Sequence, residues 1–265
     1  MSKETVSKNP SGNRLRPPVN GTAKQRYRWA IHSLSAAQKP AQGVPAYTRW
    51  VNRRGARVVA AFAYALGWTP NMVTAISAIL SLIGMIMIVF APPVGWTGIV
   101  AAIFFAAGYL FDSADGQLAR VSATSSATGE WVDHVVDAFR SPAIHGAVAI
   151  AIVLHRPDYA WLAVVAVGYS IVTSGQFLSQ ILAEALIRKA GRAQTRGGNL
   201  RSWILLPTDP GILCWTFILW GSASLFSVGY GLLAAVAVAH ALVSMRRRYQ
   251  DLQALDVAGK EAHLA

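Results

Sequence analysis

Long apolar runs alternate with short charged segments between residues 70 and 246. Each run comes close to the roughly 20 residues that a helix needs to cross a bilayer. Pro92 and Pro93 end the first run, as expected for residues that break helices and begin turns. The pattern therefore predicts an all-α integral membrane protein with six transmembrane helices, at about 71–91, 96–115, 130–154, 160–187, 208–225 and 228–245.

The segment before the first run, residues 45–69, mixes aromatic and aliphatic side chains with four arginines. Its apolar part, 58–68, is too short to cross a bilayer. Helices with one apolar and one basic face lie in the plane of the membrane interface. We therefore expect 45–69 to form an amphipathic helix on the cytoplasmic interface, with Gly67 and Pro70 marking the turn into the first span.

The two ends of the chain are polar. Residues 1–44 are basic and rich in Ser, Asn and Pro, a composition typical of a disordered tail. Residues 247–265 are expected to form a second cytoplasmic tail. The six spans, 70–246, then make one folded domain, which would carry any catalytic site.

Charge gives the domain an orientation. The chain carries a net charge of +12, although only 14% of its residues are charged. In the predicted topology every Lys and Arg except Arg156 lies on the face that holds both termini. Cytoplasmic loops are enriched in these residues, so this face and both termini are expected in the cytoplasm. Because the basic residues flank apolar segments, anionic lipids and phosphorylated substrates are expected as partners, and nucleic acid is not.

Four aspartates lie at membrane depth, where charged residues are costly and mark functional sites. Asp112 and Asp115 close the second span, and Asp133 and Asp137 open the third. Their spacings, i,i+3 and i,i+4, place each pair on one helix face. Four neighbouring carboxylates need cations between them or protons on them. An oxygen-only cluster suits Mg²⁺ or Mn²⁺, and four carboxylates are enough for two ions.

The residues between the two aspartate pairs suit a phosphate ligand. Gly116 and Ala119 leave room beside the backbone, and Gly129 does the same before the third span. Arg120 can grip a phosphate through two hydrogen bonds. The single cysteine, Cys214, excludes an intramolecular disulfide, and there is no Cys/His spacing of a zinc site.

Residues 112–137 read DSADGQLARVSATSSATGEWVDHVVD. This segment resembles the signature of the CDP-alcohol phosphotransferase family, D-x2-D-G-x2-A-R-x8-G-x3-D-x3-D, at every fixed position. The upstream segment Pro70–Thr74 is similar to the P-N-x-x-T element of the same family. The resemblance implies a dimeric six-span enzyme with a cytoplasmic site, which transfers a substituted phosphate from a CDP-alcohol to a hydroxyl and releases CMP.

The resemblance also implies roles for individual residues. Asp112, Asp115 and Asp133 would hold two Mg²⁺ or Mn²⁺ ions, and Asp137 would sit beside the ions as the general base. The CDP pocket would be formed by Asn71, Thr74, Gly116, Ala119, Arg120 and Gly129. Basic residues on the same face would contact the acceptor or a headgroup phosphate: Arg140, Arg188, Lys189 and Arg192.

The substrates stay open at this stage. Transfer of a phosphatidyl group from CDP-diacylglycerol to a small polar alcohol is the preferred reading. The alternative within the family is transfer from CDP-choline or CDP-ethanolamine to a lipid acceptor. An alternative from another class is a membrane transporter that binds cations at the carboxylates. Transport sites lie near the bilayer midplane, whereas these aspartates gather toward one face, which favours an enzyme.

Overall fold

The computed structural model describes residues 7–8, 14–15, 21–36, 44–191 and 199–264. Five helices in this part of the chain are long and apolar enough to cross a membrane. They identify the chain as an integral membrane protein built from helices, as the hydropathy pattern predicted. The five are α3 (Pro70–Phe90), α4 (Gly95–Val121), α5 (Ala127–His155), α6 (Ala160–Lys189) and α9 (Ala223–Leu264).

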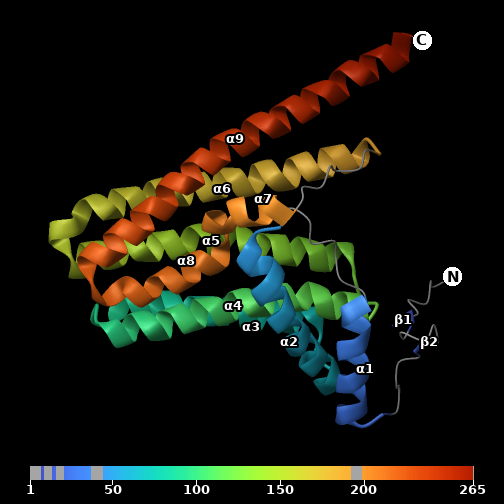
Figure 1. The fold of residues 1–265 in the computed structure, drawn as a ribbon, viewed down its shortest axis with the longest axis horizontal. Helices are drawn as coiled ribbons and strands as arrows, with labels where there is room; N and C mark the ends of the chain where they lie inside the picture. Colours follow the sequence, from blue (N-terminus) through green and yellow to red (C-terminus); the bar gives the residue numbers. More distant parts are fainter. Residues whose placement is uncertain (1–6, 9–13, 16–20, 37–43, 192–198, 265) are drawn as a thin grey trace.

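These helices form a bundle. Helix α3 lies along α4, and α5 packs against both α3 and α6. A short 3₁₀ turn, Pro157–Tyr159, joins α5 to α6. Helix α9 crosses α6 and continues well past the bundle (Figure 1).

Five of the six expected spans are confirmed as long apolar helices, and the fifth, 208–225, is not confirmed as one. The expected span 208–225 is a short apolar unit made of α8 (Pro210–Thr216) and a 3₁₀ segment, Phe217–Gly221. At roughly 1.5 Å per residue this unit extends about 18 Å, short of the ~30 Å hydrocarbon core. A Cβ on Gly221 would lie 2.6 Å from the backbone nitrogen of Gly95, so the unit ends where its backbone meets the start of α4. The remaining short elements are α7 (Asn199–Ile204) and a 3₁₀ turn, Leu206–Thr208.

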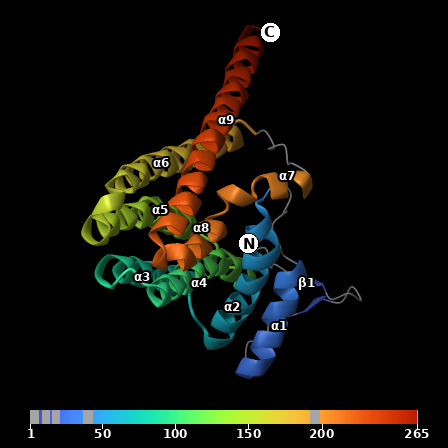
Figure 2. The same cartoon turned by 60° about the vertical axis from the view of Figure 1, so that its left-hand side comes forward.

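The N-terminal part contains more structure than its composition predicted. Strands β1 (Ser7–Lys8) and β2 (Arg14–Leu15) pair antiparallel, and α1 (Ala23–Ala36) is helical within the expected tail. Helix α1 lies beside α2 (Arg53–Leu66) at one end of the bundle (Figure 2). Its Ala30 and Leu34 are fully buried there, and this burial stabilises a helix that its polar composition alone would not.

Side-chain caps fix the starts of α3 and α5. Thr69 precedes α3, and its hydroxyl accepts a hydrogen bond from the Met72 backbone at 3.3 Å. Ser126 precedes α5 and accepts from the Gly129 backbone at 3.0 Å. Both are favoured N-cap residues. Each cap satisfies one of the backbone N–H groups that have no partner within the first turn of the helix.

The end of the bundle away from the caps is held by a buried arginine. Arg156 follows α5 and is 8% exposed. It donates to the backbone carbonyls of Trp220 and Pro93, and its guanidinium lies 5.1 Å from the Trp220 ring centre. The bonds join the end of α5 to the α3–α4 turn and to the short apolar unit.

Helices α3 and α4 lie close together at Gly108. A Cβ at this position would lie 2.4 Å from the Ser81 hydroxyl and 3.1 Å from the Ser77 carbonyl oxygen. Gly108→Ala therefore forces the two helices apart, and overpacking of this kind costs about 1–3 kcal/mol. We expect a lower thermal unfolding midpoint in detergent.

Gly146→Ala is the matched control for that variant. Gly146 lies within α5, and no described atom comes within 4 Å of a Cβ built there. Alanine favours helix over glycine, so this variant should unfold at the wild-type temperature or above it. Equal midpoints for the two variants would contradict the close approach at Gly108.

Candidate active site

Three carboxylates meet where α4 faces α5. Asp112 comes from α4, and Asp133 and Asp137 lie one turn apart on α5. One oxygen atom from each lies within 4.8 Å of the other two. A single cation could touch all three, and such a ligand set suits Mg²⁺ or Mn²⁺. The cluster therefore fits a hard divalent cation.

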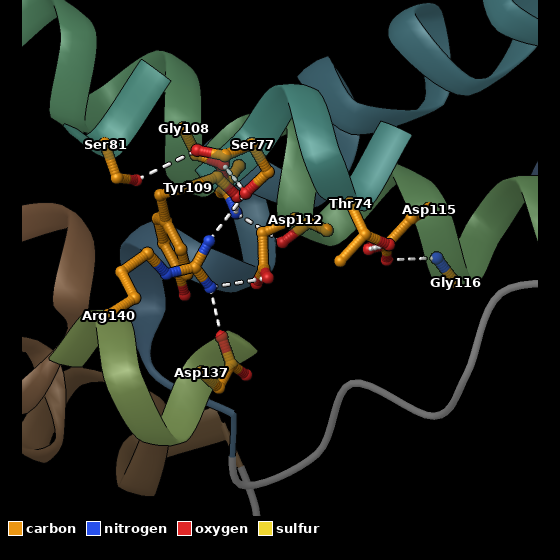
Figure 3. A network of polar contacts seen from close by, with 12 residues as sticks. Thr74, Ser77, Ser81, Gly108, Tyr109, Asp112, Asp115, Gly116, Asp137 and Arg140 are labelled. Atoms are coloured by element: carbon orange, nitrogen blue, oxygen red, sulfur yellow. Dashed lines mark hydrogen bonds and ion pairs between the residues drawn. The ribbon is translucent and has the colours of Figure 1, made fainter. Parts of the chain in front are cut away.

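The fourth aspartate is turned toward α3. Asp115 is 4% exposed, and its Oδ2 accepts a hydrogen bond from the Thr74 hydroxyl at 2.6 Å. Figure 3 shows Asp115 and Thr74 to one side of Asp112 and Asp137. A carboxylate oxygen keeps accepting capacity beyond one hydrogen bond, so Thr74 orients Asp115 without blocking it as a ligand.

Arg140 lies inside the carboxylate cluster. Its Nη2 donates to Asp112 Oδ1 at 2.5 Å and also to Asp137 Oδ1, while Nη1 donates to the Ser77 hydroxyl at 2.6 Å (Figure 3). Ser77 in turn donates to the carbonyl of Gly108 at 2.8 Å. The sequence suggested a headgroup contact for Arg140. That contact stays a prediction, and in this structure the guanidinium supplies positive charge beside Asp112 and Asp137.

The residues expected in a CDP pocket fall into two neighbouring groups. Asn71 Oδ1 lies 3.9 Å from the position of a Cβ on Gly129, so the starts of α3 and α5 face each other there. On α4, the Arg120 guanidinium lies 3.5 Å from the position of a Cβ on Gly116. Arg120 Nε is buried and has no hydrogen-bond partner among the described residues. Ala119 lies next to Arg120 and is half-buried.

Two of the predicted basic contact residues, Arg188 and Lys189, lie in the last turn of α6. Arg188 pairs with Glu130 at 3.5 Å, and both side chains are exposed. The pair joins the end of α6 to the start of α5. Lys189 is exposed at the last position of α6, and Arg192 lies outside the described residues. Exposed pairs of this kind contribute little to stability.

A cavity of about 180 Å³ opens beside the carboxylates. Asp112, Asp137 and Arg140 form its charged end. Most of the remaining wall is hydrocarbon or aromatic, with Ser81, Ser141, Tyr109 and Cys214 adding the other polar atoms; the apolar lining residues are Phe105, Ile144, Phe177, Pro210, Leu213 and Phe217. The space is amphiphilic, with its charge concentrated at the aspartates.

Sequence reasoning missed a second carboxylate network behind this cavity. Asp209, 1% exposed, precedes α8 and accepts from the backbone and the hydroxyl of Thr48. Burial raises the pKa of the Asp209 carboxyl, and the hydrogen bonds donated by Thr48 and Gly211 act in the opposite direction. The only local signal was an Asp directly before Pro210, which is typical of a helix N-cap.

The site thus combines a cluster of aspartates, an arginine that bonds two of them, and the nearby glycines Gly116 and Gly129, and all of these lie on membrane helices or at their ends. A family profile described as CDP-alcohol phosphatidyltransferase matches residues 67–243, which include every residue of the cluster. A search of curated proteins gives no match. The profile covers well over half of the chain and confirms the resemblance carried by the spaced aspartates. The chain therefore belongs to the CDP-alcohol phosphatidyltransferase family.

Proposed function

We propose that the protein is a metal-dependent enzyme of phospholipid synthesis, which transfers the phosphatidyl group of CDP-diacylglycerol to a small polar alcohol and releases CMP. The observation that carries the proposal is the meeting of Asp112, Asp133 and Asp137 within 4.8 Å, in a chain of this transferase family. The family makes a purely transporting role unnecessary to explain the intramembrane carboxylates.

Four aspartates would hold the cations in this proposal. Asp112, Asp133 and Asp137 form the cluster, and Asp115, which Thr74 holds on the next turn of α4, would join it. Two Mg²⁺ or Mn²⁺ ions would offset the charge of the pyrophosphate and of the departing CMP. Arg140 forms ion pairs with two of these aspartates. When cations bind, these ion pairs would have to weaken or break, because the cations would use the same carboxylate oxygens.

Other residues would bind the donor and manage the proton. Asp137 lines the cavity and would act as general base. The acceptor oxygen forms a bond to the β-phosphorus, the bond from that phosphorus to CMP breaks, and the acceptor proton passes to Asp137. Arg120, with a buried Nε that lacks a partner among the described residues, would bind a donor phosphate. The remaining CDP contacts would come from Asn71, Thr74, Gly116, Ala119 and Gly129.

Helix α2 would lie in the cytoplasmic interface. Its alanine face is buried against α1 and α4, while its opposite side exposes an apolar stripe: Val51 in the preceding turn, then Val58, Phe62 and Leu66. An exposed apolar stripe beside arginines suits the boundary between headgroups and acyl chains. With the positive-inside charge distribution, this supports a cytoplasmic location for both termini and the active site. We also propose a homodimer, by analogy with the family.

The apolar cavity favours a second candidate within the same family. A small polyol in this space would leave hydroxyls without partners, and each buried unpaired hydroxyl costs about 1–3 kcal/mol. Apart from the charged end, the lining side chains that offer polar atoms, among the residues that the structure describes, are Ser81, Ser141, Tyr109 and Cys214. A lipid alcohol has one reacting hydroxyl, which would lie at the charged end of the cavity, and a hydrocarbon body, which would contact the apolar wall. Transfer from CDP-choline or CDP-ethanolamine to such an acceptor is therefore the alternative.

CMP release from protein in lipid nanodiscs tests the proposal. The wild type is given CDP-diacylglycerol, Mg²⁺ or Mn²⁺, and a pool of glycerol, inositol and serine. We expect CMP release that stops when EDTA removes the cations, because the carboxylates then lack the charge that holds the pyrophosphate. Dividing the pool then identifies the acceptor.

A second arm replaces these substrates with CDP-choline or CDP-ethanolamine and diacylglycerol. CMP release in this arm alone would support the lipid-acceptor alternative and overturn the preferred donor. Release that persists at full rate in EDTA would contradict the role of the carboxylates. Absence of CMP with every donor would contradict the enzymatic proposal altogether.

A further inference from the structure

The π-helical turn Thr48–Asn52, just before α2, is joined to the start of α8 through a buried carboxylate. Asp209 Oδ2 accepts from the Thr48 backbone at 2.7 Å, and Oδ1 accepts from the Thr48 hydroxyl at 2.8 Å. The Gly211 backbone also donates to Oδ1 at 3.0 Å. Gly211 leaves room for the Tyr47 ring, since a Cβ there would lie 2.0 Å from it. The turn and α8 are therefore docked closely.

The same turn contacts α4 on both sides of Asp112. The Thr48 hydroxyl lies 2.6 Å from the Tyr109 hydroxyl. Because Thr48 gives its one proton to Asp209, Tyr109 must donate to Thr48. One turn later, Asn52 Nδ2 donates to the Ser113 hydroxyl at 2.6 Å and to the Tyr109 carbonyl at 3.3 Å. Two residues of the turn thus fix Tyr109 and Ser113, which flank Asp112 in the sequence.

Tyr109 connects this network to the cavity. Its ring forms part of the cavity wall together with Asp112, Asp137 and Arg140, and Figure 3 shows it beside Arg140 and Asp112. Tyr109 precedes Asp112 by three residues, so both lie on one face of α4. A buried carboxylate costs free energy unless it is fully hydrogen-bonded. Asp209 accepts hydrogen bonds from Thr48, whose hydroxyl contacts the Tyr109 hydroxyl at the cavity wall.

We propose that Asp209 and Thr48 are positioning residues for the acceptor half of the transfer: they hold the Tyr109 ring as a wall of the cavity, so that the acceptor hydroxyl is kept beside Asp112 and Asp137. The inference rests on the proposed function for its link to the acceptor. The wall itself can be tested without any reaction, because the only cysteine of the chain, Cys214, is 5% exposed and lines the same cavity.

The test compares Thr48→Val, Tyr109→Phe and the double variant, all in nanodiscs. Thr48→Val keeps the shape of the side chain and the backbone bond to Asp209, but loses the hydroxyl that joins Asp209 to Tyr109. We expect each single variant to speed the reaction of Cys214 with N-ethylmaleimide by about fivefold or more. The double variant should add nothing further, because coupled residues of one network are not additive.

Kinetics of CMP release form the second readout. The half-saturating concentration of the glycerol, inositol and serine pool should rise about tenfold, the size expected for one lost hydrogen bond. The half-saturating concentration of CDP-diacylglycerol should stay at the wild-type value. Thr48→Ser keeps the hydroxyl and should show the wild-type rate of Cys214 labelling and the wild-type half-saturating concentration of the alcohol pool.

Thr97→Val is the matched control. Thr97 is a fully buried threonine at the other end of α4, where it donates to the Pro92 carbonyl at 2.7 Å. Thr97→Val should lower the unfolding midpoint without changing the rate of Cys214 labelling or the half-saturating concentration of the alcohol pool. If Thr48→Val behaves in the same way, the positioning role is overturned. Absence of CMP release from the wild type would refute the proposed function, while the labelling result would still decide whether Thr48 and Asp209 hold the wall.

Discussion

Asp137→Asn is expected to reduce CMP release by about 10²–10⁴-fold, the range attributed to general acid–base catalysis. The change keeps the size of the side chain but removes its ability to take the acceptor proton. It also removes one charged oxygen from the group that Asp112, Asp133 and Asp137 form within 4.8 Å. The measurement is the initial rate of CMP release at saturating CDP-diacylglycerol and Mn²⁺.

Asp158→Asn provides the control for that result. Asp158 is exposed in the short turn between α5 and α6, beyond the end of α5 opposite to the carboxylates. This variant loses the same charge but should keep the wild-type rate. An Asp137→Asn variant within a factor of a few of the wild type would assign the base to another residue.

Arg140→Gln is expected to make the stability of the protein depend on divalent cations. In the structure Arg140 bonds Asp112 and Asp137 at once. Removing one partner of a buried ion pair leaves uncompensated charge and costs about 3–5 kcal/mol. A bound cation supplies the missing charge, so Mn²⁺ should recover most of the loss. The check is the thermal unfolding midpoint in EDTA and in Mn²⁺.

Arg156→Gln is the control for this experiment. Arg156 is 8% exposed and sits at the far end of the bundle, where it bonds backbone carbonyls. Its loss should lower the midpoint in both conditions, and Mn²⁺ should raise it only as much as in the wild type. An equal gain with Mn²⁺ in Arg140→Gln and the wild type would contradict the role of Arg140 as the internal counter-charge.

The aspartate cluster could be foreseen because it depends on local spacing. Asp133 and Asp137 are four residues apart on one helix, and helical periodicity alone places them on one face. Arg140 follows Asp137 by three residues, so its return to the same face was present in the sequence too. Its bonds to Asp112 and Ser77 depend on how α3, α4 and α5 rotate against one another, and no single-helix pattern contains that information.

Other features depended on tertiary packing from the start. Thr48 and Asp209 are separated by 161 positions, and only the docking of the π-helical turn against α8 brings them together. The short length of the helix at the fifth expected span has a different reason. Hydropathy measures composition over a window, whereas the length of the helix was limited by Pro210 at its start and Gly221 at its end. Helix α1 likewise depends on the burial of Ala30 and Leu34 against its neighbours.

The short apolar unit has a consequence for how such enzymes diversify. Pro210, Leu213, Cys214 and Phe217 all line the cavity, yet they belong to a segment that contributes none of the clustered aspartates. Substitutions there can reshape the space beside the reacting groups while α4 and α5 keep their carboxylates in place. In the proposed reaction, selection could therefore change which alcohol is accepted independently of the aspartates on α4 and α5, and new lipid products would arise from small changes in one segment.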